Sequence, residues 1–151
     1  MKAPRAPKRR IDAKFARFRL RIARSAKHRY GVFALEDIPA NRRVIEYTGK
    51  RLTLEQLGKI KPPQDTYIAL IKPGWFVDGR RDGSGAELMN HSCEPNLVAR
   101  RVRGHLLLFS RRKIRAGEEL TWNYHYPIKV QRIACRCGAR GCRGTLRIVL
   151  S

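Results

Sequence analysis

The stretch Asn90-His91-Ser92-Cys93-Glu94-Pro95-Asn96 holds one of the four cysteines of this 151-residue chain. The other three, Cys135, Cys137 and Cys142, follow in a C-x-C-x4-C pattern within the last seventeen residues. A structural zinc site is tetrahedral and closed to solvent, and it favours soft thiolate ligands. We therefore predict one structural Zn²⁺ held by these four cysteines, which would tie the tail to the body of the protein.

Two disulfides would also use four cysteines, but the sequence argues against them. Cys135 and Cys137 are poorly placed to bridge each other, and we expect no signal peptide. The chain is also long enough to form a core without such cross-links. Nearby guanidinium groups at Arg136, Arg140 and Arg143 would offset the negative charge of four thiolates around a divalent ion.

Length and charge set the wider limits. A chain with 42% hydrophobic residues can bury one sizeable core, and no hydrophobic run approaches membrane-spanning length. The formal net charge is +22, which favours nucleic acid, acidic proteins or anionic surfaces as partners. Basic residues dominate the N-terminus, where Pro4 and Pro7 also occur, so residues 1–16 are predicted to form a disordered basic arm. This arm is either a solvated tail or a nucleic-acid contact.

The body of the chain alternates short apolar runs with turn residues, which is typical of a mainly β protein with several small sheets. Strands are predicted from Phe18, over 31–34 and 44–47, and then over 67–71, 75–77, 97–102, 106–109 and 120–124. One helix is predicted to begin after Thr53, because Gln56 three residues later completes a capping box, and to stop at Pro62.

Four motifs occur together in one order along the chain. They are Tyr30-Gly31-Val32-Phe33-Ala34, the Asn90 to Asn96 stretch, Gly117-Glu118-Glu119-Leu120-Thr121, and the cysteine-rich tail. In this combination the chain resembles the SET-domain protein lysine methyltransferases from about Phe18 to Leu146. The resemblance implies a SET-domain β-clip with few short helices and a C-terminal pseudoknot. It divides the chain into the basic arm at 1–16, a SET catalytic domain at 17–127 and a zinc-binding post-SET tail at 128–151.

The resemblance also implies a cofactor and a set of site residues. S-adenosylmethionine would bind at Tyr30, Gly31, Asn90 and His91, with Leu146 against the adenine. Tyr124 would orient the attacking lysine amine, and the lysine channel would be lined by Tyr67 and Tyr47. These tyrosines could instead be ordinary strand aromatics, an alternative that is strongest for Tyr47. His91 on its own could equally be a packed, hydrogen-bonded histidine.

Some positions depart from the family pattern. Arg29 stands where the family commonly has a glycine, Glu87 where it often has an arginine, and Asn123 where it often has an aspartate. Trp122 stands where a Phe or Tyr usually influences how many methyl groups are added. Because an indole is bulkier, we predict mono- or dimethylation.

The first hypothesis is an S-adenosylmethionine-dependent protein-lysine N-methyltransferase acting on an exposed lysine of a basic protein, either DNA-associated or ribosomal. It is expected to be a minimal, stand-alone enzyme with no membrane contact. It would be intracellular, in the cytoplasm or nucleoid of a bacterium or the nucleus of a eukaryote. The alternative is a catalytically inactive basic zinc module that binds nucleic acid, which the net charge alone would support.

Overall fold

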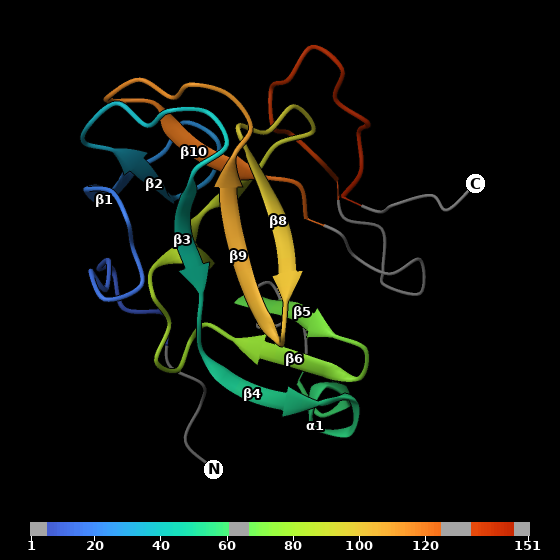
Figure 1. The fold of residues 1–151 in the computed structure, drawn as a ribbon. Helices are drawn as coiled ribbons and strands as arrows, with labels where there is room; N and C mark the ends of the chain where they lie inside the picture. The colour runs from blue at the N-terminus through green and yellow to red at the C-terminus, as the bar shows by residue number, and fades with distance from the viewer. Residues whose placement is uncertain (1–5, 61–66, 125–133, 147–151) are drawn as a thin grey trace.

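The computed structural model describes residues 6–60, 67–124 and 134–146 as three small sheets around one core (Figure 1). The first sheet has the order β1-β2-β10-β7, the second β3-β9-β8 and the third β4-β6-β5. Their bounds are β1 Leu20–Arg24, β2 Tyr30–Ala34, β3 Arg43–Tyr47, β4 Lys50–Thr53, β5 Ile68–Lys72, β6 Trp75–Asp78, β7 Asn90–His91, β8 Leu97–Val102, β9 His105–Ser110 and β10 Glu119–Trp122. In Figure 1 the β3-β9-β8 sheet stands between the other two.

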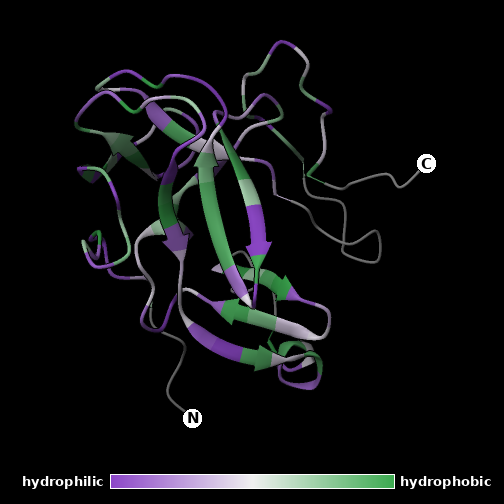
Figure 2. Cartoon of the chain, viewed as in Figure 1, coloured by the Kyte–Doolittle hydropathy of each residue, from purple (hydrophilic) through white to green (hydrophobic). Residues whose placement is uncertain are grey.

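Strand β9 lies at the centre of its sheet, between β3 and β8, and its side chains alternate between buried and more exposed positions. Leu106 and Leu108 are fully buried, whereas His105, the first residue of the strand, is exposed. Successive residues of a strand point to opposite faces, so this pattern directs one leucine-rich face to the core. Figure 2 shows the hydrophobic character of β9 and the hydrophilic end of β8, where Arg100 and Arg101 lie.

Helical structure is limited to short pieces in the described residues. Helix α1 spans Leu54–Gly58, and the predicted capping box is present because Thr53 Oγ1 accepts from the Gln56 N–H and Gln56 Oε1 accepts from the Thr53 N–H. The predicted stop at Pro62 lies outside the described residues. A 3₁₀ turn, η2, spans Ala86–Leu88 just before the Asn90 stretch. No helix of the described chain is long and apolar enough to cross a membrane.

The strand that precedes the tail is held between two distant parts of the chain. Strand β10 pairs antiparallel with β2 and parallel with β7, where Thr121 lies opposite Asn90 and Trp122 opposite His91. The Ser92 N–H then donates to the Trp122 carbonyl at 3.2 Å. This pairing carries Tyr124 to the Asn90 to Cys93 loop and so positions the candidate site.

The described part of the predicted disordered arm, residues 6–16, differs from the prediction because much of it is packed. Ile11 and Ala16 pack against the core, and the Asp12 N–H donates to the Ser84 carbonyl at 2.8 Å. Ala16 also forms a bridge with Ile45 of β3. The prediction missed this packing because the apolar residues are few and widely spaced among many charged ones. Their burial against the core helps to fix the segment in place.

Candidate functional site

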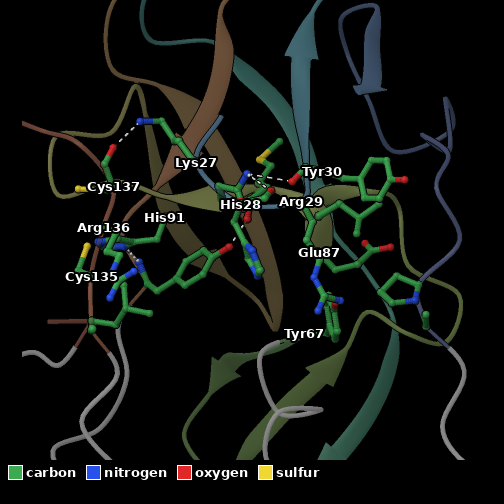
Figure 3. A pocket seen from close by; sticks show the side chains of 18 of the residues that line it. Lys27, His28, Arg29, Tyr30, Tyr67, Glu87, His91, Cys135, Arg136 and Cys137 are labelled. Atoms are coloured by element: carbon green, nitrogen blue, oxygen red, sulfur yellow. Dashed lines mark hydrogen bonds between the residues drawn. The ribbon is translucent and has the colours of Figure 1, made fainter. Parts of the chain in front are cut away.

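A cavity of about 450 Å³ lies where the Asn90 loop, the β1–β2 turn, the N-terminal arm and the cysteine tail meet (Figure 3). Among the residues predicted to form the site, it brings together Tyr30, Asn90, His91, Leu146, Tyr67, Tyr124, Cys135 and Cys137. Five other predicted site residues lie outside its lining: Gly31, Tyr47, Cys93, Trp122 and Cys142. Its volume falls in the range of small-molecule and cofactor sites.

Asn90 organises the wall between the β1–β2 turn and β10. Its Nδ2 donates to the Tyr30 carbonyl at 2.9 Å and to Glu119 Oε1 at 2.8 Å. A Cβ on Gly31 would lie 2.3 Å from Glu119 Oε1 and 3.2 Å from Asn90 Nδ2. Glycine at position 31 is therefore required for this close approach, and its role is to shape the wall.

Arg29, the departure from the family glycine, has a φ of 31°. This is the left-handed region that favours glycine, so the local backbone keeps the turn that a glycine would adopt more easily. The arginine side chain also lines the cavity. The departure therefore adds a cation to the cavity while retaining the turn.

Tyr124 is held from three sides at the cavity. Its hydroxyl donates to the Met89 carbonyl, and its backbone N–H donates to His91 Nδ1 at 2.9 Å. The ring centroid lies 5.3 Å from that of His91 and 5.3 Å from that of Trp122. A phenol oxygen that donates one hydrogen bond still has lone pairs to accept another, so Tyr124 can orient an amine in the cavity.

Tyr47 and Trp122 support this group from the core. Tyr47 is 4% exposed, its hydroxyl donates to the Tyr67 carbonyl at 2.7 Å, and its ring lies 5.9 Å from that of Trp122. The position of Tyr47 thus agrees with the strand-aromatic alternative and makes it a support for Tyr67. Trp122 is 7% exposed and packs between Tyr47 and Tyr124.

Three of the four predicted metal ligands, Cys93, Cys135 and Cys137, form a compact cluster with His91, in which one potential ligand atom from each residue lies within 4.8 Å of the others. The fourth predicted ligand, Cys142, is not part of this cluster. The Cys93 and Cys135 sulfurs are 3.8 Å apart. Tetrahedral zinc with Zn–S bonds of about 2.3 Å places neighbouring sulfurs about 3.8 Å apart, so this spacing fits the ion. The donor atoms therefore suit zinc in both type and distance.

Hydrogen bonding favours His91 as a donor to the cysteine cluster over His91 as a metal ligand. Because Nδ1 accepts from the Tyr124 N–H, the neutral ring carries its proton on Nε2, which lies 3.3 Å from Cys93 Sγ. A protonated Nε2 can donate to the thiolate and cannot bind the ion. Cys142, whose sulfur lies 3.7 Å from the Cys135 carbonyl oxygen, is then the remaining candidate for the fourth ligand.

The cysteines differ in how readily they ionise. Burial raises the pKa of Cys135 to about 12. Burial also opposes ionisation of Cys137, but the backbone N–H groups of Cys93 and Ala139 and the neighbouring thiols outweigh it and lower the pKa to about 6. Cys137 thus ionises more readily than Cys135, and a divalent ion would provide the charge needed to ionise Cys135.

Polar contacts dock the tail onto the body around this cluster. Lys27 Nζ donates to the Cys137 carbonyl at 2.6 Å, and Glu94 Oε1 accepts from the Gly141 N–H at 3.0 Å. Arg143 donates from its backbone to Cys93 Sγ at 3.4 Å and from its guanidinium to Asn123 Oδ1 at 2.8 Å. These contacts hold the cysteine tail, which forms one end of the cavity wall, against the body of the protein beside the cysteine cluster.

Glu87 is the one carboxylate in the described cavity lining, and it is buried. Burial raises its pKa to about 7, with a further increase from Asp78, although N–H groups including that of Gly85 oppose the shift. Asp78 itself is held by Arg80 in a buried ion pair at 2.7 Å. The family's usual arginine would carry the opposite charge here, so this position changes the electrostatics of the loop that precedes Asn90.

Because its folded-state pKa is raised, Glu87 should make the protein less stable as pH rises from about 4.5 to 7. Over that range the unfolded carboxyl ionises while the buried one stays protonated, which costs up to about 3 kcal/mol. Urea unfolding between pH 5 and 8 should show this decline in the wild type, and Glu87→Gln should reduce it. Equal pH profiles for the two proteins would contradict the effect.

The sequence interpretation missed several cavity residues. Pro7 and Arg9 come from the segment predicted to be disordered, and Lys27 comes from the β1–β2 turn. Leu88 and Met89 directly precede Asn90, and this position next to the motif is the one sequence feature that could have identified them as cavity residues. The contribution of the arm depends on tertiary packing and has no local signature.

Comparisons with known proteins agree on the family. The SET domain family model matches residues 29–125. Histone-lysine N-methyltransferase SETD1 of Drosophila melanogaster is 36% identical over 143 residues, which cover 88% of this chain and 9% of that protein. Human histone-lysine N-methyltransferase SETD1A is 32% identical over 149 residues, which cover 88% of this chain and 8% of that protein. The chain thus spans less than one tenth of the length of these two relatives.

Solved structures show the same architecture. KRYPTONITE in complex with mCHG DNA and SAH superposes with a TM-score of 0.72 and 33% identity, over 87% of this chain and 29% of that chain. SUVH6 of Arabidopsis thaliana in complex with SAM gives a TM-score of 0.78 and 26% identity, over 89% and 34% of the two chains. The predicted fold class is confirmed. Since the family model covers well over half of its length, this chain belongs to the SET domain family.

Proposed function

We propose that the protein is a protein-lysine N-methyltransferase that uses S-adenosylmethionine and acts on histone-like basic proteins. The observation that carries the proposal is the single cavity shared by the Asn90 loop, Tyr67, Tyr124 and the cysteine tail. The similarity to proteins named histone-lysine N-methyltransferases supports the same reaction class. It favours the DNA-associated part of the predicted substrate class over the ribosomal part.

The residues of the cavity fit the proposed cofactor. The volume suits a molecule of this size, and the lining combines cations for a carboxylate with backbone and amide groups for polar atoms. S-adenosylmethionine would supply an electrophilic methyl group at its sulfonium. Tyr30, Asn90, His91 and Leu146 would hold the cofactor, with Gly31 allowing the close approach of Asn90.

The charges of the cavity favour a neutral lysine amine, which is the form that attacks. A free lysine has a pKa near 10.4, so it must lose a proton before it can accept a methyl group. Four cationic side chains line the cavity against the single carboxylate of Glu87, and nearby positive charge together with burial lowers the pKa of an amine. The lining cations are Arg9, Lys27, Arg29 and Arg136.

Positioning is the remaining requirement, and the aromatic side chains supply it. Tyr67 would flank the aliphatic stem of the lysine, and Tyr124 Oη would accept a hydrogen bond from the amine and direct its lone pair toward the methyl group. Tyr47 supports Tyr67 from behind through its hydroxyl. The zinc held by Cys93, Cys135, Cys137 and Cys142 would keep the tail closed over the cofactor end of the cavity.

The direct test is transfer of label from methyl-labelled S-adenosylmethionine to purified core histones, with ribosomal proteins of similar charge assayed in parallel. Label on histone lysines supports the proposal, and preference for ribosomal proteins would contradict the substrate class. Absence of both transfer and cofactor binding, together with a shift of DNA in a gel, would favour the inactive nucleic-acid module. The match to the SET domain family and the similarity to histone-lysine N-methyltransferases give that module no support.

A nucleic-acid contact is a second part of the proposal, and a net charge of +22 supports it. The predicted contact is the basic arm, whose Lys8 and Arg10 are exposed and lie outside the cavity lining. If the host is a eukaryote, action on histones implies a nuclear location. Nucleic acid could also bridge a basic enzyme and a basic substrate that would otherwise repel each other.

Trp122 is expected to limit the number of methyl groups added to one or two. Its indole is buried 5.3 Å from the Tyr124 ring, so it restricts the space into which a methylated amine can turn. Trp122→Phe should raise the share of the higher methylation states several-fold without abolishing activity. Mass spectrometry of a lysine peptide at complete turnover measures this, and efficient trimethylation by the wild type would contradict it.

A further inference from the structure

The N-terminal arm forms a wall of the candidate cofactor cavity. Ala6, Pro7 and Arg9 line the cavity, and Pro7 is buried although the flanking residues are exposed. Two contacts anchor the segment just beyond Arg9. The Asp12 N–H donates to the Ser84 carbonyl, and Ile11 packs so closely on Gly85 that a Cβ there would lie 2.7 Å from Ile11 Cδ1.

Arg9 reaches the cavity through Tyr30, one of the residues predicted to bind the cofactor. Its guanidinium carbon lies 4.0 Å from the centroid of the Tyr30 ring, which is well within the range of a cation–π contact. Arg24 approaches the same ring at 5.6 Å. The stacked geometry leaves the edge of the guanidinium, with its N–H donors, available to an anion in the cavity.

The cavity has two chemically different ends. Figure 3 shows Cys135, Arg136 and Cys137 on one side and Arg29, Tyr30 and Glu87 on the other. At the cysteine end, Lys27 Nζ is already engaged by the Cys137 carbonyl at 2.6 Å. The tail also brings in Leu146, the residue that the family resemblance places against adenine, so an elongated cofactor would direct its amino-acid end toward Tyr30.

That amino-acid end carries the one anionic group of S-adenosylmethionine, its α-carboxylate. We propose that Arg9 of the N-terminal arm binds this carboxylate and that residues 6–9 complete the cofactor pocket. The inference rests on the proposed function, because it presumes the cofactor. Arginine matches a carboxylate with two parallel N–H donors, and such charge-assisted pairs are the stronger hydrogen bonds of proteins.

The test compares two ligands and two arginine variants by isothermal titration calorimetry. One ligand is S-adenosylhomocysteine, which cannot transfer a methyl group, and the other is its decarboxylated analogue, which lacks only the α-carboxylate. Arg9→Ala removes the proposed partner, and Arg10→Ala is the matched control because Arg10 is exposed and lies outside the cavity lining. Thermal melting of the unliganded variants checks that both remain folded.

The wild type and Arg10→Ala should bind S-adenosylhomocysteine about tenfold more tightly than the decarboxylated analogue. Arg9→Ala should bind the two ligands with nearly equal affinity, because the α-carboxylate gains nothing once its proposed partner, the Arg9 guanidinium, has been removed. Equal weakening of both ligands by Arg9→Ala, or no weakening of either, would overturn the proposed contact. A wild type that binds neither ligand would contradict the proposed function itself.

Discussion

Replacing Cys93 by serine is expected to remove zinc from the protein and to release the tail from the body. Cys93 is the only cysteine outside the tail, and its sulfur lies 3.8 Å from that of Cys135 and 3.4 Å from the Arg143 N–H. A serine hydroxyl is a poor ligand for zinc at neutral pH, and structural zinc binding contributes about 10–16 kcal/mol to folded domains. Because the ion is lost with this ligand, most of that contribution is lost as well, and the free energy of unfolding should fall by at least several kcal/mol.

Elemental analysis and thermal melting measure the two parts of this expectation. The wild type should contain about one zinc per chain, and Cys93→Ser should contain almost none. S-adenosylhomocysteine binding should be lost with the metal, because Cys135, Arg136, Cys137 and Leu146 of the tail line the cavity. A wild type purified without stoichiometric zinc, or a Cys93→Ser protein that retains it, would contradict the site.

Two further substitutions identify the fourth ligand. Cys142→Ser should lose zinc as Cys93→Ser does, because the protonated Nε2 of His91 leaves Cys142 to complete the tetrahedron. His91→Gln keeps an N–H donor beside Cys93 and should retain the ion with an affinity lowered by roughly 10- to 100-fold. The reverse result, in which the ion requires His91 and tolerates the loss of Cys142, would assign a Cys₃His site.

The strands that were predictable from the sequence are those with an apolar face. Strand β8 was predicted with its observed bounds, and β9 differs by one residue at each end. Strand β4 was missed because Leu52 is its one buried residue, so no alternation stands out among Lys50 and Arg51. Strand β7 has two residues and exists because β10 lies beside it, which no local pattern reveals.

The cysteine cluster was more predictable than the cavity. Thiolate chemistry and the count of four cysteines restrict the possible ligands, and the structure brings Cys93 to Cys135 and Cys137 across more than forty residues. The lining of the cavity depends instead on tertiary packing, so Arg9 in the arm had no sequence signal. The tautomer of His91 likewise follows from its contact with the Tyr124 N–H, which forms only in the folded chain.

Replacing Tyr124 by phenylalanine is expected to lower the rate of methyl transfer by about 10²–10³-fold, the usual cost of removing one positioned polar group from a reacting centre. The hydroxyl is fixed by donating to the Met89 carbonyl, so its lone pairs are directed before the substrate arrives. Phenylalanine keeps the ring that packs on His91 and Trp122. Affinity for S-adenosylhomocysteine should therefore change little, and the loss should occur in kcat measured with a lysine peptide.

Tyr47→Phe provides the comparison, because it removes the same atom from a neighbouring tyrosine. The Tyr47 hydroxyl contacts the Tyr67 carbonyl at 2.7 Å and lies outside the cavity lining. Its loss should cost about 1 kcal/mol of stability and reduce kcat less than tenfold. If Tyr124→Phe and Tyr47→Phe reduced kcat equally, orientation of the amine by Tyr124 would be excluded, and the two hydroxyls would share a structural role in holding the aromatic cluster.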